Sequence, residues 1–151
     1  MSILSWLKTV THGEGSAELI AATPMHFAPG EEEFHGLNMK EALDTHLKWV
    51  QRLERQMGGV DHEEVDIAHV AGDHNCVLGT WIHGAAKRQF GELPAYAELR
   101  QAHADFHLGV GRILNDVQNG DAMSAESGMK KIRHQSGMVQ LALIRLYSTG
   151  A

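Results

Sequence analysis

The sequence predicts an all-α protein, an antiparallel four-helix bundle with a short, irregular second helix and an N-terminal extension. Three observations predict this fold. Proline occurs only at Pro24, Pro29 and Pro94, the alternation typical of strands is scarce, and apolar residues in the long segments recur at steps of three and four residues. The segments are joined by connections of modest length, which favours antiparallel packing of neighbours. With 151 residues, the chain can bury a sizeable core.

The first long helix is expected to begin after Asn38 and to stop at Gly58-Gly59. Asn38 is a favourable N-cap, and Glu41 stands three residues later, where a capping-box partner belongs. One face of this segment is apolar apart from one histidine, and it carries Met39, Leu43, His46, Val50, Leu53 and Met57.

The second helix is expected from about Asp73 to His83, with Gly84 as its end. The turn before it, from about Val60 to Ala71, is expected to be partly helical. This is the shortest and most irregular of the four helices, since glycines flank it on both sides.

The third helix is expected to start at Pro94, a favourable residue in a first turn, and to end at Gly120. Its inward stripe consists of Leu99, His103, Phe106, Val110, Ile113, Leu114 and Val117. The fourth helix is expected to run from an Asp121 cap to about Tyr147, with Met129, Ile132, Ser136, Val139, Leu143 and Leu146 facing inward.

Residues 1–37 are expected to form the N-terminal extension, and residues 38–151 the bundle domain. The extension begins with an apolar stretch, MSILSWLKTV, read as a short amphipathic helix, and continues with a loop rich in turn formers and acidic residues. The apolar stretch lacks a positively charged start and contains Lys8, so it is a poor secretory signal. No apolar run approaches the roughly 20 residues of a membrane-spanning helix. We therefore expect a cytoplasmic protein.

Composition narrows the classes of partner. The formal charge is −6 with the histidines neutral, and the 13 Lys and Arg residues are scattered. Without a basic stripe, a nucleic-acid partner is not expected. The single cysteine excludes an intramolecular disulfide and favours a reducing compartment.

Three of the 11 histidines are candidates for metal ligands. His46 and His103 stand on the inward stripes of the first and third helices. His107 follows His103 by four residues, about 40° round the helix, so both imidazoles can reach one point. A single histidine on an apolar face is more often a core residue than a ligand. The convergence of three such histidines with Cys76 in one bundle is what favours a metal site.

A His₃Cys set suits Zn²⁺, which binds imidazole nitrogen at ~2.0–2.1 Å and thiolate sulfur at ~2.3 Å in a tetrahedral array. Four protein ligands leave no open coordination position. Such a closed site favours a structural or sensing role over hydrolysis.

The motifs DTHLKW, CVLGTW and HADFH, in this order, resemble the chemoreceptor zinc-binding domain family. The signature of that family is a histidine three residues before an aromatic, then Cys-x-hydrophobic-Gly-x-aromatic, then His-x-x-x-His. The resemblance extends from about Asn38 to the end of the fourth helix. It implies a non-catalytic bacterial regulatory module that responds to zinc, or to an oxidant such as hypochlorous acid, with zinc held by His46, Cys76, His103 and His107.

The resemblance also implies partners. Relatives are often fused to a chemoreceptor signalling domain or to a diguanylate cyclase, and this chain contains neither. We therefore expect a standalone member that acts in trans on such a signalling protein. A homodimer is also expected, because relatives sit in dimeric proteins and the apolar start needs cover: Ile3, Leu4, Trp6, Leu7 and Val10.

Several polar residues near the site have two interpretations. Asp44 and Asp73 are either acceptors for ligand imidazoles or, respectively, a helix-surface residue and an N-cap. His69 and His83 each lie seven residues from Cys76 and would share its face on a continuous helix, which Gly72 and Gly84 argue against. The remaining histidines are expected to be solvated or without an identified partner: His12, His26, His35, His62, His74 and His134.

Two other functions are considered beside the zinc regulator. A hemerythrin-like di-iron oxygen carrier is also a four-helix bundle with an HxxxH pair, but it needs bridging carboxylates, and the inward stripes carry no Asp or Glu. A purely structural zinc protein or zinc buffer would use the same four ligands and stays open at this point.

Overall fold

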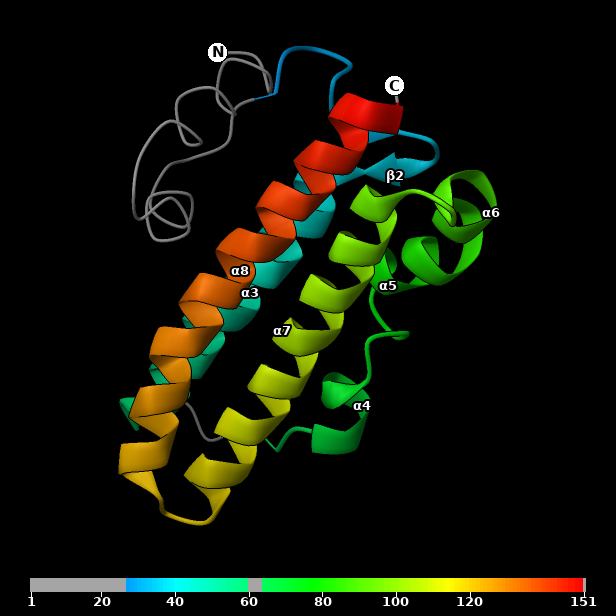
Figure 1. Cartoon of the computed structure of the whole chain (residues 1–151). Coiled ribbons are helices and arrows are strands. Elements are labelled where there is room, and N and C mark those ends of the chain that lie inside the picture. The colour runs from blue at the N-terminus through cyan, green and yellow to red at the C-terminus, as the bar shows by residue number, and fades with distance from the viewer. Residues whose placement is uncertain (1–26, 60–63, 151) are drawn as a thin grey trace.

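The computed structural model describes residues 27–59 and 64–150. Three long helices dominate it: α3 (Met39–Met57), α7 (Pro94–Gln118) and α8 (Ala122–Gly150). Helices α3 and α7 run in the same direction, and α8 returns alongside them (Figure 1). A chain of short helices takes the place of a second long helix. The predicted fold, a helical bundle with an irregular second helix, is thereby confirmed.

The second helix is broken into four pieces: α4 (Ile67–Ala71), α5 (Val77–Trp81), the π-helical turn η1 (Ile82–Ala86) and α6 (Lys87–Phe90). The predicted start at Asp73 is wrong, because the helix begins at Val77 with Cys76 as its N-cap. The predicted end at Gly84 is also wrong. The helix passes through Gly84 as a π turn and ends at Gly91, and the Tyr96 hydroxyl donates a hydrogen bond to the Ile82 carbonyl at 3.0 Å.

A small hairpin precedes α3, where the sequence predicted only loop. Its strands are β1 (Glu33–Phe34) and β2 (Leu37–Asn38), paired antiparallel. The two turn residues between them, His35 and Gly36, have positive φ values of 45° and 86°, as a type I′ turn requires. Phe34 and Leu37 are buried in the core of the bundle. Strands of two residues are too short to produce a detectable alternation in sequence. The predicted N-terminal amphipathic helix lies outside the described residues.

The long helices begin where the sequence predicted. The Asn38 side chain accepts a hydrogen bond from the Glu41 N–H at 2.9 Å, and the Asp121 side chain accepts one from the Ser124 N–H at 3.1 Å. The predicted inward stripes are buried, except that Met57 and Val117 are only partly so. The apolar core between α3, α7 and α8 therefore forms the rigid support of the site.

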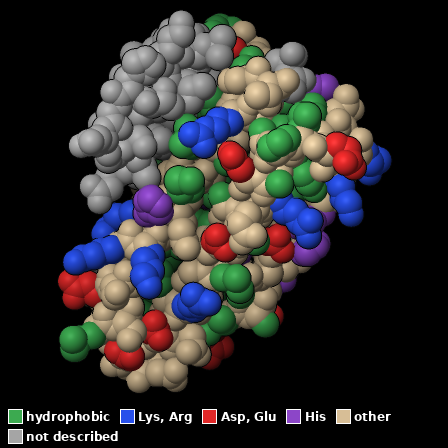
Figure 2. Space-filling view, viewed as in Figure 1, with side chains coloured by type: hydrophobic (Ala, Val, Ile, Leu, Met, Phe, Trp, Pro, Cys, Tyr) green, Lys and Arg blue, Asp and Glu red, His purple; other side chains and the backbone are tan. Residues whose placement is uncertain are grey.

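The outer surface carries charges of both signs. On the face shown in Figure 2, Lys and Arg side chains lie interspersed with Asp and Glu. Two ion pairs tie α8 to its neighbours, Arg133 to Glu54 on α3 at 3.0 Å and Arg145 to Glu98 on α7 at 3.5 Å. None of the helices described here has the length and apolar character needed to cross a bilayer.

Candidate metal centre

Four side chains from three parts of the fold meet beside the core. They are His46 on α3, Cys76 before α5, and His103 and His107 on α7, and their ligand atoms all lie within 4.8 Å of one another. The three histidines are buried, with 3%, 0% and 4% of their surface exposed, and Cys76 is partly buried. The structure thus brings together all four residues that the sequence singled out.

The distances between these atoms suit a tetrahedral ion. The Cys76 Sγ lies 4.0 Å from the His46 Nε2, 3.2 Å from the His103 Nε2 and 3.5 Å from the His107 Nε2. The two α7 nitrogens are 3.0 Å apart. Bond lengths of ~2.0–2.3 Å at tetrahedral angles place sulfur and nitrogen about 3.5 Å apart, and two nitrogens slightly closer. An ion of the size of Zn²⁺ therefore fits between the four atoms with only small adjustments.

Backbone carbonyls orient two of the imidazoles. The His46 Nδ1 donates to the Ala42 carbonyl at 2.6 Å, and the His107 Nδ1 donates to the Val70 carbonyl at 2.7 Å. A proton held on Nδ1 leaves the Nε2 lone pair free to bind a metal. The alternative that Asp44 supports a ligand imidazole is wrong: Asp44 is exposed and pairs with Lys40 at 3.6 Å.

Burial keeps the histidines neutral. Desolvation lowers the pKa of His46 from 6.5 to about 4, although the hydrogen bond to Ala42 opposes the shift. Desolvation, together with the neighbouring His107 and His46, lowers the pKa of His103 to about 2. Desolvation also lowers the pKa of His107. Neutral imidazole is the form that binds metal. Near pH 7 the three histidines can therefore bind a cation without first losing a proton.

Cys76 has two roles in the local structure. Its sulfur accepts a hydrogen bond from the Gly79 N–H at 3.2 Å and so caps α5. Burial raises the pKa of the thiol, an effect that the hydrogen bond from Gly79 partly offsets. Without a metal, the group is therefore a thiol at neutral pH. A bound cation would favour the thiolate instead.

The Asp73 carbonyl and the His103 ring approach Gly79 closely because glycine has no side chain. A Cβ there would lie 1.8 Å from the Asp73 carbonyl oxygen and 3.2 Å from the His103 Cε1. Only glycine lets the chain before Cys76 and the His103 ring pack against this turn. The glycine of the CVLGTW motif thus serves the geometry of the site.

The two tryptophans of the motifs have other surroundings. Trp81 packs on Phe34 and Phe90, and its Nε1 donates to the His35 carbonyl at 2.9 Å. The Arg52 guanidinium lies over the partly buried Trp49 ring. These contacts are those of core and surface packing.

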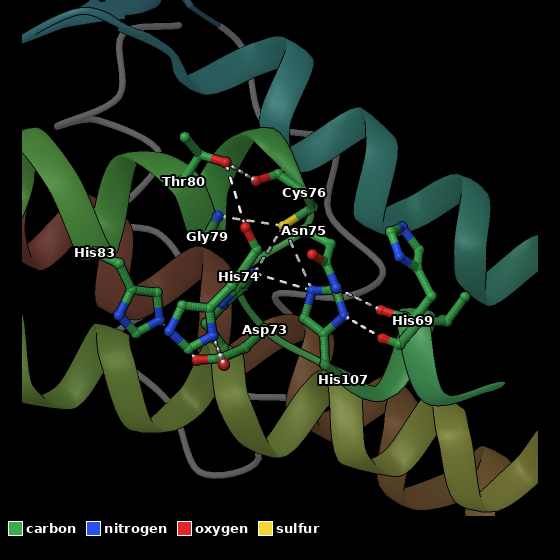
Figure 3. Close-up of polar contacts among 11 residues, drawn as sticks. His69, Asp73, His74, Asn75, Cys76, Gly79, Thr80, His83 and His107 are labelled. Carbon is green, nitrogen blue, oxygen red and sulfur yellow. Dashed lines mark hydrogen bonds and ion pairs between the residues drawn. The ribbon is translucent and has the colours of Figure 1, made fainter. Parts of the chain in front are cut away.

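The other histidines lie apart from the centre. His83 does not share the face of Cys76; it pairs with Asp73 at 3.0 Å, as does His74 (Figure 3). Asp73 is therefore neither the N-cap of α5 nor hydrogen-bonded to a ligand imidazole. His35, His69 and His134 are exposed, while His12, His26 and His62 lie outside the described residues. Sequence reasoning missed the grouping of Asp73, His74 and His83 because it placed helix boundaries at Asp73 and Gly84.

Fold and cluster together define a helical-bundle protein with a buried His₃Cys metal centre. The family model of the chemoreceptor zinc-binding domain matches residues 46–114, a range that contains all four side chains. This part of the chain matches the model of that family, and the His₃Cys cluster supports Zn²⁺ as its metal. The family is one of zinc-binding regulatory modules. Searches of curated proteins and of solved structures found no match.

Proposed function

We propose that the protein is a non-catalytic zinc regulator in which His46, Cys76, His103 and His107 are the four ligands. The observation that carries the proposal is the convergence of one sulfur and three Nε2 atoms within 4.8 Å of one another in a buried position. Four protein ligands would complete a tetrahedral shell and leave no place for a substrate. A closed shell supports regulation rather than hydrolysis.

The arrangement of the ligands suggests how zinc would act on the fold. Two ligands come from α7 and one from α3, both long and well packed, whereas Cys76 lies on the short, broken segment. Zinc occupancy would therefore fix the Cys76 segment against the long helices, and zinc loss would release it. The position of α4 to α6 is then the output of the module.

The same sulfur offers a response to oxidants. In net terms, a thiolate gives an electron pair to the oxygen of hypochlorous acid, the S–O bond forms, the O–Cl bond breaks and chloride leaves. The product at Cys76 is a sulfenic acid, a poorer ligand than the thiolate. Oxidation would thus have the same structural effect as zinc loss.

The composition of the cluster separates this function from the hemerythrin-like alternative. A di-iron centre requires bridging carboxylates, and the cluster contains none. A purely structural zinc site would use the same ligands, and it differs only in lacking a response of the α4–α6 segment. We further propose a cytoplasmic homodimer that acts in trans on a chemotaxis or cyclic-dinucleotide signalling protein.

Metal analysis tests the ligand assignment. Protein purified without chelators should contain about one Zn²⁺ per chain, because one four-ligand site holds one ion. Replacement of Cys76 by alanine should weaken zinc binding by orders of magnitude in a chelator competition. His46→Ala, His103→Ala and His107→Ala should behave alike.

His134→Ala is the matched control, since His134 is exposed on α8 and does not belong to the cluster. This variant should keep the zinc affinity of the unmodified protein. Full zinc retention by Cys76→Ala would refute the assignment.

A further inference from the structure

A second group of metal-binding side chains lies on the surface next to the buried centre. It consists of Asp73, His74 and His83, whose ligand atoms also lie within 4.8 Å of one another. The His74 Nδ1 and the Asp73 Oδ1 are 3.0 Å apart, and the His83 Nε2 and the Asp73 Oδ2 are 3.0 Å apart. Neither the zinc proposal nor the family motifs use these three residues.

The geometry brings two imidazole nitrogens to one carboxylate. The rings of His74 and His83 lie face to face, with centroids 3.7 Å apart and planes inclined by 10° (Figure 3). Each ring directs one nitrogen at the Asp73 carboxylate. A cation that takes the place of the two N–H protons would have two nitrogen ligands and one oxygen ligand.

Two features of the local fold produce this arrangement. Asp73 and His74 stand in a turn of the connection between α4 and α5, held where Gly79 lets the Asp73 carbonyl approach. His83 stands in the π turn η1, which departs from the regular α-helical spacing. Single π turns inside α-helices occur often at functional sites.

The group has the charge and exposure of a site that exchanges metal with solvent. Burial disfavours the Asp73 carboxylate, but the hydrogen bond from His83 and the nearby His83 and His74 charges outweigh it, so the pKa of Asp73 is lowered and the group is anionic at pH 7. The His74 side chain is 67% exposed, whereas those of Asp73 and His83 are about a fifth exposed. Water can therefore reach the cluster and fill the remaining coordination positions.

We propose that Asp73, His74 and His83 form a second, solvent-accessible site for Zn²⁺, distinct from the buried His₃Cys centre. Two imidazoles and one carboxylate are ligands of borderline softness that suit zinc and disfavour Ca²⁺ and Mg²⁺. On binding, the ring nitrogens that face Asp73 give up their protons and present the freed lone pairs to the ion. With three ligands and no thiolate, this site binds zinc more weakly than the buried centre and loses its ion during purification.

Calorimetric titration of the metal-free full chain with Zn²⁺ tests the proposal. The expected result is two phases, a tight one for the buried centre and a weaker one for the surface site. His83→Ala and His74→Ala should each lower the zinc affinity of the second phase and leave the first phase unchanged. The loss of affinity should exceed the roughly 10–100-fold that follows removal of a ligand's hydrogen-bond partner. Cys76→Ser should do the reverse. The two sites, and the failure of either assignment, are thereby distinguished.

His69→Ala and His134→Ala are the matched controls, because both histidines are exposed and belong to neither cluster. Titration with Co²⁺ gives a second readout: only the buried centre contains sulfur, so the first equivalent alone should produce a thiolate-to-cobalt absorption band. A single binding phase in the unmodified protein, or a second phase unchanged in His83→Ala, would overturn the proposal. So would a second phase lost equally in His69→Ala.

Discussion

At the scale of single residues, Gly79 controls how closely Cys76 approaches the histidines of α7. Its missing side chain makes room for the Asp73 carbonyl on one side and the His103 ring on the other. Its N–H also holds the Cys76 sulfur. Any side chain at this position must therefore displace the connection that carries Cys76.

Replacement of Gly79 by alanine should lower both the zinc affinity and the free energy of unfolding. The new Cβ would stand 1.8 Å from a backbone oxygen, which only a backbone shift can relieve. We expect a loss of about 1–3 kcal/mol in unfolding free energy, measured by urea denaturation of the zinc-loaded protein.

Gly84→Ala is the control, since a Cβ at Gly84 meets nothing within 4 Å. It should leave zinc binding unchanged and stabilise the helix by roughly 0.5–1 kcal/mol. Equal effects of the two substitutions would contradict the steric explanation.

Proton release on zinc binding follows from the residue environments. The three histidines proposed as ligands have lowered pKa values and are neutral at pH 7, whereas the raised pKa of Cys76 keeps its thiol protonated. Binding at the buried centre should therefore release about one proton, from Cys76. Calorimetry of the tight phase in buffers of different ionisation enthalpy measures this number. Cys76→Ala should reduce it toward zero, and release of two or more protons would show that the histidines start out charged.

At the scale of elements, the long helices could be predicted and the broken one could not. Helices α3, α7 and α8 repeat the apolar stripe over many turns and begin at recognisable caps, so local sequence determines them. The segment from Ile67 to Phe90 has no such stretch. Its π turn accompanies tertiary contacts, such as the hydrogen bond from Tyr96 to the Ile82 carbonyl, that no local pattern encodes.

The two clusters of candidate metal ligands show the same limit of prediction from sequence. His46 and the His103–His107 pair could be identified because they stand on regular helices, where spacing determines direction. Cys76 was identified by its motif. The grouping of Asp73 with His83 depends on a connection and a π turn, and therefore became visible only in the structure.

Oxidation of Cys76 should loosen the α5–α6 segment selectively. The Cys76 sulfur caps α5, and its conversion to sulfenic acid removes the soft anionic ligand. Short helices with few supporting turns are the elements most ready to open. Hydrogen exchange after treatment with hypochlorous acid should accelerate across residues 73–90 and stay unchanged in α8. Unchanged exchange across residues 73–90, after chemical trapping has confirmed sulfenic acid, would mean that the centre has only a structural or zinc-sensing role.

At the scale of the whole molecule, acid should destabilise the metal-free protein. In the unfolded chain, His46 takes up a proton near pH 6.5, but in the folded state only near pH 4. The unfolded state therefore binds more protons within this window, and stability falls as the pH falls through it. For His46 alone the loss is about 3 kcal/mol, and the other buried histidines add to it. Urea unfolding of the apo protein between pH 7 and pH 4.5 measures this dependence.

His46→Gln should flatten that pH dependence, while His134→Gln, a change at an exposed position, should not. Identical slopes for both variants would mean that acid acts elsewhere in the molecule.

The proposed homodimer is a prediction for the assembled molecule. Light scattering at micromolar concentration should give twice the mass of the 151-residue chain. Removal of the apolar start, residues 1–10, should reduce dimer formation if that segment supplies the interface. A monomer for the full chain would refute the dimer.

All four proposed ligands of the buried centre lie between residues 46 and 107, and α8 supplies none of them. A bound ion is then a cross-link that closes loops of 27 to 31 residues in the chain. Because the ion binds the folded ligand set in preference to the unfolded chain, its binding free energy adds to the free energy of unfolding of the part that it joins. Helix α8 stands outside every loop, and among the described residues packing and two ion pairs hold it to α3 and α7. Under force applied at the C-terminus, α8 would detach first, while the ion would still join α3, the Cys76 segment and α7.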